Sequence, residues 1–266
     1  MLLLRWDEAE EILTELTLLE SVRDLVAATL LAGCGLAATP AFADETDPPS
    51  DFTFSGYVQG VSDYRFRGLS RSGGDFAVQG SINLNHSSGF YVGTWASRLE
   101  DTPVYGSTEV DLYGGWTGAL GSGITADVGL LYYVYPNGRV GKANYFEPYA
   151  SLTAAIGPAT AKLGVAYAPS QDSLGNQDNT YVFTDLGAGI PNTPISVAAH
   201  LGYADGVQSP DLLTGNGTGG GFDYSVGATY AITSKFSVGA SYIGVDGNSI
   251  KRFSDDTIVA TVKLAF

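Results

Sequence analysis

The last twelve residues of the chain alternate between apolar and polar positions and end on an aromatic residue. One face of this segment carries only apolar side chains, namely Ile258, Ala260, Val262, Leu264 and Phe266. The other face carries polar and smaller side chains, namely Thr257, Val259, Thr261, Lys263 and Ala265. Because successive side chains of a strand point to opposite faces, residues 255–266 are predicted to form a strand with one apolar face.

The composition limits how such strands can be arranged. The 266-residue chain has 35 Gly, 16 Tyr and 12 Phe but only 15% charged residues, so it is rich in glycine and aromatics and poor in charge. After residue 43, no uncharged apolar run approaches the roughly 20 residues that a membrane-spanning helix needs. In a lipid bilayer such a chain must form a closed β-barrel, since only helices and closed barrels satisfy their backbone hydrogen bonds there.

The N-terminal segment has the features of a secretory leader. An apolar stretch at 25–36 is followed by Pro40 and by small residues at Ala41 and Ala43, a pattern typical of cleavage between Ala43 and Asp44. Residues 23–43 are therefore predicted to be a signal peptide.

Two segments flank this predicted leader. The acidic segment 1–22 is predicted to be a non-structural extension or the result of a mis-assigned start, because a leader normally begins with basic residues. Residues 44–51 are predicted to be a short periplasmic linker to a barrel at 52–266. An alternative reading of 31–34 is a lipoprotein box, in which Cys34 would be lipidated.

The first prediction concerns maturation. The mature N-terminus is expected to be Asp44, because the spacing of the small residues before it suits signal peptidase. Mass spectrometry of the N-terminal peptide of the exported protein checks this expectation. A mature chain that begins with a lipidated Cys34 would contradict it.

Charge and cysteine content exclude several functional classes. The net charge is −15, and removal of the two basic and seven acidic residues of the leader leaves −10, which argues against nucleic-acid binding. The single cysteine, Cys34, lies in the leader, so the mature chain has neither disulfides nor thiolate metal sites. Neither a cofactor nor a metal ion is expected.

Twelve strand-like segments follow in the predicted mature chain: 52–64, 75–85, 89–99, 107–118, 123–135, 144–156, 159–169, 179–190, 194–204, 221–232, 235–245 and 255–266. Short connections alternate with longer ones at 65–74, 100–106, 136–143, 170–178, 205–220 and 246–254. This alternation predicts an all-β fold, a single transmembrane antiparallel up-and-down barrel of about 12 strands with short periplasmic turns and longer extracellular loops. A soluble sandwich does not account for the alternating loop lengths.

The side-chain pattern predicts which face of each strand points inward. A basic group facing lipid at the midplane costs about 2–4 kcal/mol, so the polar faces must point into the barrel. Aromatic residues near the segment ends are predicted to form interfacial girdles, namely Phe90, Tyr145, Phe146, Tyr203, Phe222 and Phe236.

Four stretches carry distinctive sequences at a regular spacing: SDYRFRG at 62–68, GFYVGTWAS at 89–97, EVDLYG at 109–114 and YYVYP at 132–136. These stretches resemble the TorF family of porin-like proteins. The resemblance implies an outer-membrane channel reached through the periplasm. The terminal strand likewise resembles the closing strand of bacterial outer-membrane barrels, which implies that Phe266 is recognised by the barrel-assembly machinery.

The first candidate group comprises Asp63, Arg65 and Arg67, which alternate after the first strand. Their chemistry suits a salt-bridged network that lines the pore or holds the first loop inward. The alternative is a solvated rim that contacts lipopolysaccharide phosphates. A shift of the strand register by one residue exchanges the two locations, so the sequence leaves both open.

The second group comprises inward-facing acids on the fourth to sixth strands, namely Glu109, Asp111, Asp127 and Glu147. A ring of carboxylates in a pore favours cations. Arg98 and Lys162 are predicted to be their inward partners, and His200 is predicted to face the lumen. The alternative is that these charges pair across a packed lumen, where an unpaired charge would be costly.

An enzymatic function is a third possibility. His86 and Ser87 resemble part of the catalytic stretch of outer-membrane lipases, but adjacent residues of an extended chain point to opposite faces. Because they also fall in a predicted periplasmic turn, no catalytic residue is predicted. The sequence therefore predicts an outer-membrane channel for the passive diffusion of small hydrophilic solutes. The alternative is a structural or surface-contact barrel with a plugged lumen.

Overall fold

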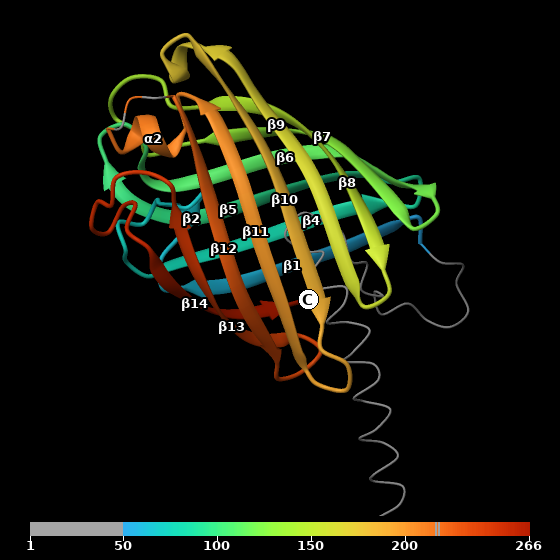
Figure 1. The fold of residues 1–266 in the computed structure, drawn as a ribbon. Helices are drawn as coiled ribbons and strands as arrows, with labels where there is room; N and C mark the ends of the chain where they lie inside the picture. The colour runs from blue at the N-terminus through green and yellow to red at the C-terminus, as the bar shows by residue number, and fades with distance from the viewer. Residues whose placement is uncertain (1–49, 216, 218) are drawn as a thin grey trace, which may run out of the picture.

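The computed structural model of the chain describes residues 50–215, 217 and 219–266. The predicted extension, the signal peptide with its Ala43–Asp44 cleavage site, Cys34 and most of the predicted linker lie outside the described residues. Within these residues, twelve antiparallel strands close into one barrel (Figure 1). The all-β barrel predicted from the sequence is thereby confirmed.

The barrel strands agree closely with the predicted segments. They are β1 (Phe52–Val61), β4 (Ala77–His86), β5 (Phe90–Thr102), β6 (Gly106–Gly121), β7 (Ile124–Val134), β8 (Tyr145–Ile156), β9 (Ala159–Gln171), β10 (Gln177–Gly189), β11 (Ile195–Gly206), β12 (Gly220–Ala231), β13 (Phe236–Val245) and β14 (Thr257–Ala265). Each barrel strand pairs with the barrel strands that precede and follow it in the chain, so β1 pairs with β4. On its other side β1 pairs with β14, which closes the barrel.

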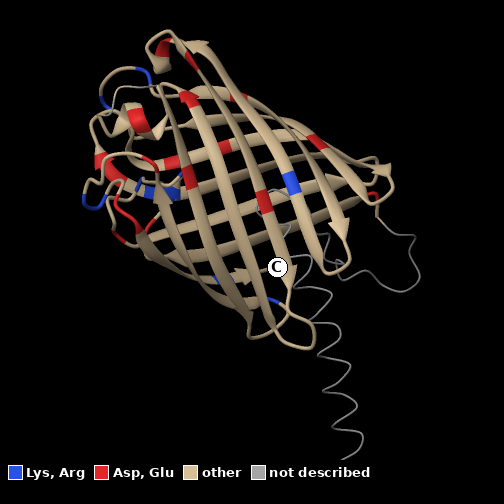
Figure 2. Ribbon diagram, viewed as in Figure 1, with Lys and Arg blue, Asp and Glu red and all other residues tan. Residues whose placement is uncertain are grey.

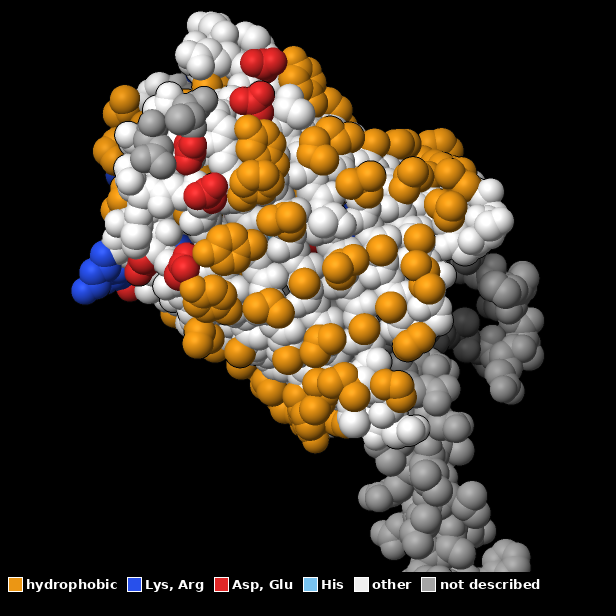
Figure 3. All heavy atoms as spheres, in the orientation of Figure 1, with side chains coloured by type: hydrophobic (Ala, Val, Ile, Leu, Met, Phe, Trp, Pro, Cys, Tyr) orange, Lys and Arg blue, Asp and Glu red, His pale blue; other side chains and the backbone are white. Residues whose placement is uncertain are grey.

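The outer surface of the strands is apolar, as the dyad pattern predicts. On β14 the even-numbered residues are exposed, with Ile258 at 69%, Val262 at 49% and Leu264 at 52%, whereas inward Val259 is only 6% exposed. On β12, Phe222 and Val226 are exposed and Asp223 is buried. Figure 3 shows hydrophobic side chains spread over the outer face of the strands, with acidic residues near one end of the barrel.

Residues 50–215, 217 and 219–266 contain little helix. A one-turn α2 (Pro210–Leu213) precedes β12, and a 3-10 turn, η2 (Asp172–Leu174), precedes β10. Among the described residues, no helix has the length and apolar character needed to cross a membrane.

The two ends of the barrel differ. The turn rim consists of the tight connections 87–89, 122–123, 157–158, 190–194 and 232–235, and the C-terminus lies at this end (Figure 1). The loop rim consists of the connections 62–76, 103–105, 135–144, 172–176, 207–219 and 246–256. At the loop rim β5 and β6 run beyond their predicted ends, because the two strands continue as a hairpin after a register shift between Arg98 and Thr102.

The prediction that Tyr145 belongs to an interfacial girdle is wrong. It is only 2% exposed and its ring stacks on Tyr133 inside the barrel, with the centroids 4.3 Å apart. The reason is parity, since Tyr145 shares the inward face of β8 with Glu147, whereas Phe146 is exposed on the outer face. The aromatic residues Phe90, Tyr203 and Phe222 are also exposed.

Inward tyrosine rings lie against glycines on the neighbouring strand. A Cβ atom at Gly115 would come within 2.6 Å of the Tyr91 hydroxyl oxygen, and one at Gly93 within 2.5 Å of the Tyr113 ring. These strand glycines therefore leave room for the rings to lie along the wall rather than across the barrel axis.

Candidate functional site

The segment after β1 folds into the barrel. β1 ends at Val61, three residues before its predicted end, and residues 62–76 include a short hairpin of β2 (Arg65–Phe66) and β3 (Leu69–Ser70). Leu69, Ser70 and Ser72 are at most 5% exposed. Of the two locations that the sequence leaves open for this segment, the structure therefore shows the lumen and not a solvated rim.

Asp63 and Arg65 anchor this segment. Arg65 Nε donates to Asp63 Oδ2 at 2.5 Å, and Arg65 Nη1 donates to the backbone carbonyls of Gly68, Phe253 and Asp255. The other carboxylate oxygen of Asp63 accepts from the hydroxyls of Ser70 and Ser72. The pair thus ties the hairpin to the loop that precedes β14.

Arg67 reaches the opposite wall of the barrel. Its Nη2 donates to both carboxylate oxygens of Glu147 on β8 at 2.8 Å, and Nη1 donates to Gln208 Oε1 at 3.0 Å. Its guanidinium carbon lies 4.1 Å from the ring centroid of Tyr181 on β10. Both members of the ion pair are buried, with side-chain exposures of 6% for Arg67 and 3% for Glu147.

Two further predicted acids, Glu109 and Asp111, lie close by on the inward face of β6. Glu109 is 2% exposed and accepts a hydrogen bond from the Tyr64 hydroxyl at 3.2 Å. Asp111 is 7% exposed, and its buried Oδ1 has no hydrogen-bond partner among the described residues. The loop-rim half of the lumen therefore contains two buried carboxylates, Glu109 and Asp111, in addition to the one that pairs with Arg67.

A second polar group lies nearer the turn rim, among the first residues of β5, β7 and β9. Asp127 accepts from the Tyr91 hydroxyl at 2.6 Å, and Tyr91 also bonds to the Tyr149 hydroxyl. Lys162 faces inward as predicted, with its ammonium 5.6 Å from the ring centroid of Phe183. These side chains line the wall formed by β5 to β10.

His200 also faces inward, as predicted, and lies between two carboxylates that the sequence reasoning did not single out as site residues. Its Nδ1 lies 2.5 Å from Asp185 and its Nε2 lies 3.0 Å from Asp223. Asp223 was visible on the polar face of its segment, whereas Asp185 lies in a segment whose alternation is poor. Within the described residues, no three His, Cys, Asp or Glu side chains are arranged to hold a metal ion.

The predicted inward position of Arg98 is wrong. Arg98 is exposed, and its Nη1 donates to the backbone carbonyl of Phe76 at 2.8 Å. Its neighbours Ser97 and Leu99 are each 3% exposed and occupy the inward face of β5. Because side chains alternate along a strand, Arg98 must point outward.

Exposed ion pairs lie at the loop rim, where Figure 2 shows that charged residues gather. Arg139 pairs with Asp101 at 2.8 Å, and both side chains are more than half exposed. Lys142 pairs with Asp172, and this hydrogen bond lowers the pKa of the Asp172 carboxyl below its ordinary value. Such exposed pairs contribute little to stability, so they are suitable controls for the buried Arg67–Glu147 pair.

The turn rim carries the His86–Ser88 turn. His86 Nδ1 lies 2.7 Å from the Ser88 hydroxyl and accepts the Ser88 backbone N–H, while the Ser87 hydroxyl donates to Asp51. The imidazole therefore bonds within its own turn. A recess of about 260 Å³ lies beside this turn, lined by residues of β1, β4, β5 and β6 and their connections.

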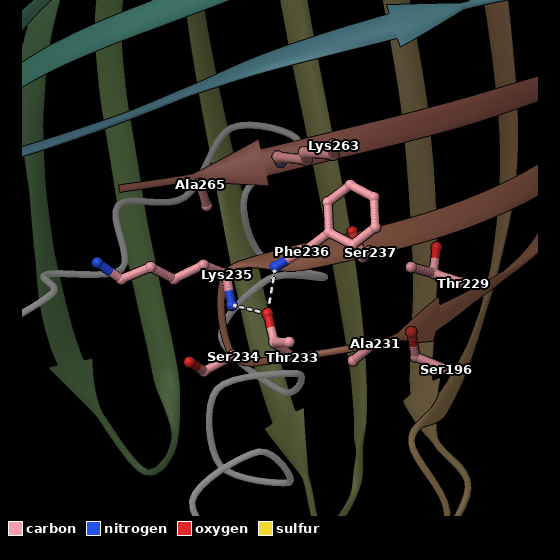
Figure 4. Close-up of a pocket in the computed structure, with 10 residues that line it drawn as sticks. All are labelled: Ser196, Thr229, Ala231, Thr233, Ser234, Lys235, Phe236, Ser237, Lys263 and Ala265. Atoms are coloured by element: carbon pink, nitrogen blue, oxygen red, sulfur yellow. Dashed lines mark hydrogen bonds between the residues drawn. The ribbon is translucent and has the colours of Figure 1, made fainter.

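A smaller cavity of about 50 Å³ lies on the other side of the turn rim, between β11, β12, β13 and β14. Figure 4 shows Lys235 and Lys263 among its lining residues, with the Thr233 hydroxyl accepting the backbone N–H groups of Lys235 and Phe236. The cavity has room for a few water molecules only. The charged residues at the loop-rim half of the lumen are thus the candidate site.

These features define a twelve-stranded barrel of the porin type, apolar outside and charged within. The chain belongs to the family described as bacterial protein of unknown function (Gcw_chp), whose model matches residues 45–266. No curated protein matches it by sequence.

Solved structures show the same fold. The NanC porin is 14% identical at a TM-score of 0.55, and the match covers 79% of this chain and 98% of that one. The KdgM porin in complex with disordered oligogalacturonate is 10% identical at a TM-score of 0.53, over 80% of this chain and 98% of that one. At this level of identity the likeness establishes the fold alone.

Proposed function

We propose that the protein is a porin-like channel of the bacterial outer membrane, of the TorF type, that admits small hydrophilic solutes by passive diffusion. The observation that carries this proposal is the contrast between the apolar outer face of a closed barrel and its polar, charged lumen. A barrel with no unpaired edge and an apolar outer face suits lipid, and polar inward faces suit water and solutes. The porin fold of NanC and KdgM supports the same assignment.

We also propose a location and partners for the protein. The turn rim would face the periplasm and the loop rim the outside, after export through the periplasm. The apolar strands would contact outer-membrane lipid, and the exposed charges of the loop rim, which include Arg98, would lie at the level of lipopolysaccharide. The barrel-assembly machinery is the expected partner during insertion, and no nucleic-acid partner is expected.

The polar side chains of the lumen wall between the turn rim and the β2–β3 hairpin suit the diffusion of polar solutes. The Gln59 amide donates to Gln79 at 2.6 Å, and the Tyr113 hydroxyl donates to Asn83 at 2.5 Å. Amides and hydroxyls of this kind can exchange hydrogen bonds with a solute as it passes. Because the tyrosine rings lie along the wall, they narrow the lumen less than rings that project into it.

A second candidate function is a structural or surface-contact barrel with a plugged lumen. The inward segment 62–76 favours it, because Tyr64 and Leu69 are buried inside the barrel and Tyr64 shares a cluster with Leu99 and Tyr133. The two candidates differ in conductance. A plugged barrel would show none in planar bilayers.

The test of the channel is ion selectivity. Two further basic side chains face inward among the described residues, Arg71 beside the Tyr105 ring and Lys263 with its ammonium 4.1 Å from the Tyr57 ring centroid. His200 aside, the inward acids outnumber the inward bases: Asp63, Glu109, Asp111, Asp127, Glu147, Asp185 and Asp223 against Arg65, Arg67, Arg71, Lys162 and Lys263. Reversal potentials in planar bilayers are therefore expected to show a preference for cations, more strongly at low salt, where screening is weak. Replacement of Glu109 by Gln together with Asp111 by Asn should reduce the preference without abolishing conductance.

A matched control removes two negative charges from the exposed loop rim, by Asp101→Asn with Asp172→Asn. This control should change the selectivity less than the lumen variant does. A preference for anions, or the absence of conductance, would count against a cation-selective channel.

A further inference from the structure

The group that holds Arg67 is built on the barrel wall. Glu147 lies on β8 and Tyr181 on β10, and the Tyr133 hydroxyl of β7 donates to Glu147 at 3.1 Å. Gln208, before α2, adds an amide oxygen. We propose that this wall site binds a guanidinium- or ammonium-bearing solute in transit, and that Arg67 is an internal competitor for it. The proposal rests on the proposed channel function.

The contacts of Arg67 define the chemistry of the ligand. Its guanidinium makes a two-point contact with one carboxylate and also contacts two aromatic rings, 4.1 Å from the Tyr181 centroid and 4.8 Å from the Phe66 centroid. A planar guanidinium is the group that best matches a carboxylate fork and an aromatic face. A free guanidinium group would make the same contacts, whereas a neutral isostere such as urea would lack the charge.

The side chain of Arg67 can leave without moving its segment. The anchoring hydrogen bonds of the segment are made by Asp63, Arg65 and Ser70. The adjacent Gly68 touches the wall, since a Cβ there would lie 2.9 Å from the Gly244 carbonyl oxygen. The backbone of the hairpin tip is therefore held in place, and rotation of the Arg67 side chain alone uncovers Glu147.

Asp111 supplies an independent indication that a cation belongs in this half of the lumen. Its inward carboxyl group is 7% exposed and has one oxygen without a partner, although the two guanidinium groups of Arg67 and Arg71 lie in the same half. A buried carboxylate without a partner is costly. A cationic group near Asp111, carried by the solute or by a displaced Arg67, would give this carboxylate a partner.

The experiment compares wild type, Arg67→Ala and the matched control Arg139→Ala, which removes an exposed arginine from the loop rim. Thermal unfolding of the purified barrel is followed with millimolar guanidinium chloride, with L-arginine, with urea and with sodium chloride at equal ionic strength. Guanidinium and arginine should stabilise Arg67→Ala at concentrations about tenfold or more below those that act on wild type, because the competitor is gone. Urea should have no effect on any variant, and Arg139→Ala should behave as wild type.

A second variant separates binding from folding. Arg67→Ala with Glu147→Gln carries no unpaired charge at this site and should bind neither probe. If Arg67→Ala folds only with guanidinium present, that rescue supports the site; if guanidinium neither stabilises nor rescues it, the site is overturned.

Conductance of the same preparations tests the channel separately. A variant that conducts ions but ignores guanidinium and arginine overturns the solute site and leaves the channel intact. Barrels that bind guanidinium but never conduct support the site as a cation site and refute the channel.

Discussion

Replacement of Glu147 by Leu is expected to lower the free energy of unfolding of the barrel by about 3–5 kcal/mol. The change leaves the Arg67 guanidinium without its carboxylate partner, although only 6% of this side chain is exposed. A buried charge without a partner costs more than the pair contributes, so the effect exceeds that of the lost hydrogen bonds alone. Urea unfolding in detergent micelles, followed by tryptophan fluorescence, measures the change.

The double variant Arg67→Met with Glu147→Leu is the internal control. It removes both charges and retains apolar bulk, and should therefore recover most of the lost stability. The exposed pair Arg139–Asp101 provides the matched comparison, because Asp101→Leu should cost at most about 1 kcal/mol. If Glu147→Leu costs no more than Asp101→Leu, the buried pair does not hold the segment in the lumen.

The strands of this barrel could be predicted because one rule holds along most of the wall, with apolar side chains outside and polar side chains inside. A strand such as β12 must place Phe222 and Val226 outside and Asp223 inside, and this alternation is directly visible in the sequence. The ends of β5 and β6 depart from the predicted segments. The two strands continue as a hairpin past the register shift between Arg98 and Thr102, where the alternation no longer determines which side chains point outward.

The rule that inward side chains are polar fails where the segment 62–76 fills the lumen. Leu99 points inward because the segment 62–76 covers it, and this apolar inward residue reverses the expected parity of Arg98. The pairing of Arg67 with Glu147 was also beyond the sequence. The two residues are 80 positions apart, and their contact depends on a segment that leaves the wall and crosses the lumen.

The position of Asp185 beside His200 is concealed for a related reason. On β10 the inward face carries Tyr181 and Phe183, and the outward face mixes Thr180 and Thr184 with the exposed Val182 and Leu186. With aromatic rings inside and threonines outside, the sequence does not show which face of this strand is polar. Only the register, which places Asp185 opposite His200, brings the two together.

Deletion of Phe266 is expected to lower the amount of protein in the outer membrane several-fold while secretion to the periplasm continues. Phe266 and Gly56 exchange two backbone hydrogen bonds of 3.0 Å that extend the seam between β1 and β14. The strand pairing of this seam runs only from Tyr57–Ala265 to Val61–Thr261, whereas β1 pairs with β4 from Phe52 to Val61. A loss of about 1–2 kcal/mol at a folding step changes abundance several-fold, and the short seam has few other bonds to compensate.

Two substitutions separate the ring from the backbone bonds. Phe266→Ala keeps both backbone hydrogen bonds but removes the ring that covers Gly56. The ring lies close to this glycine, because a Cβ atom added at Gly56 would lie 2.8 Å from the Phe266 ring. Phe90→Ala is the matched control, since it removes an exposed aromatic ring at the same rim from a strand away from the seam. Immunoblots of separated outer-membrane and periplasmic fractions give the measurement. If the deletion and Phe90→Ala reach the outer membrane equally well, the terminal aromatic has no special part in closing the barrel, and recognition of Phe266 during assembly is ruled out with it.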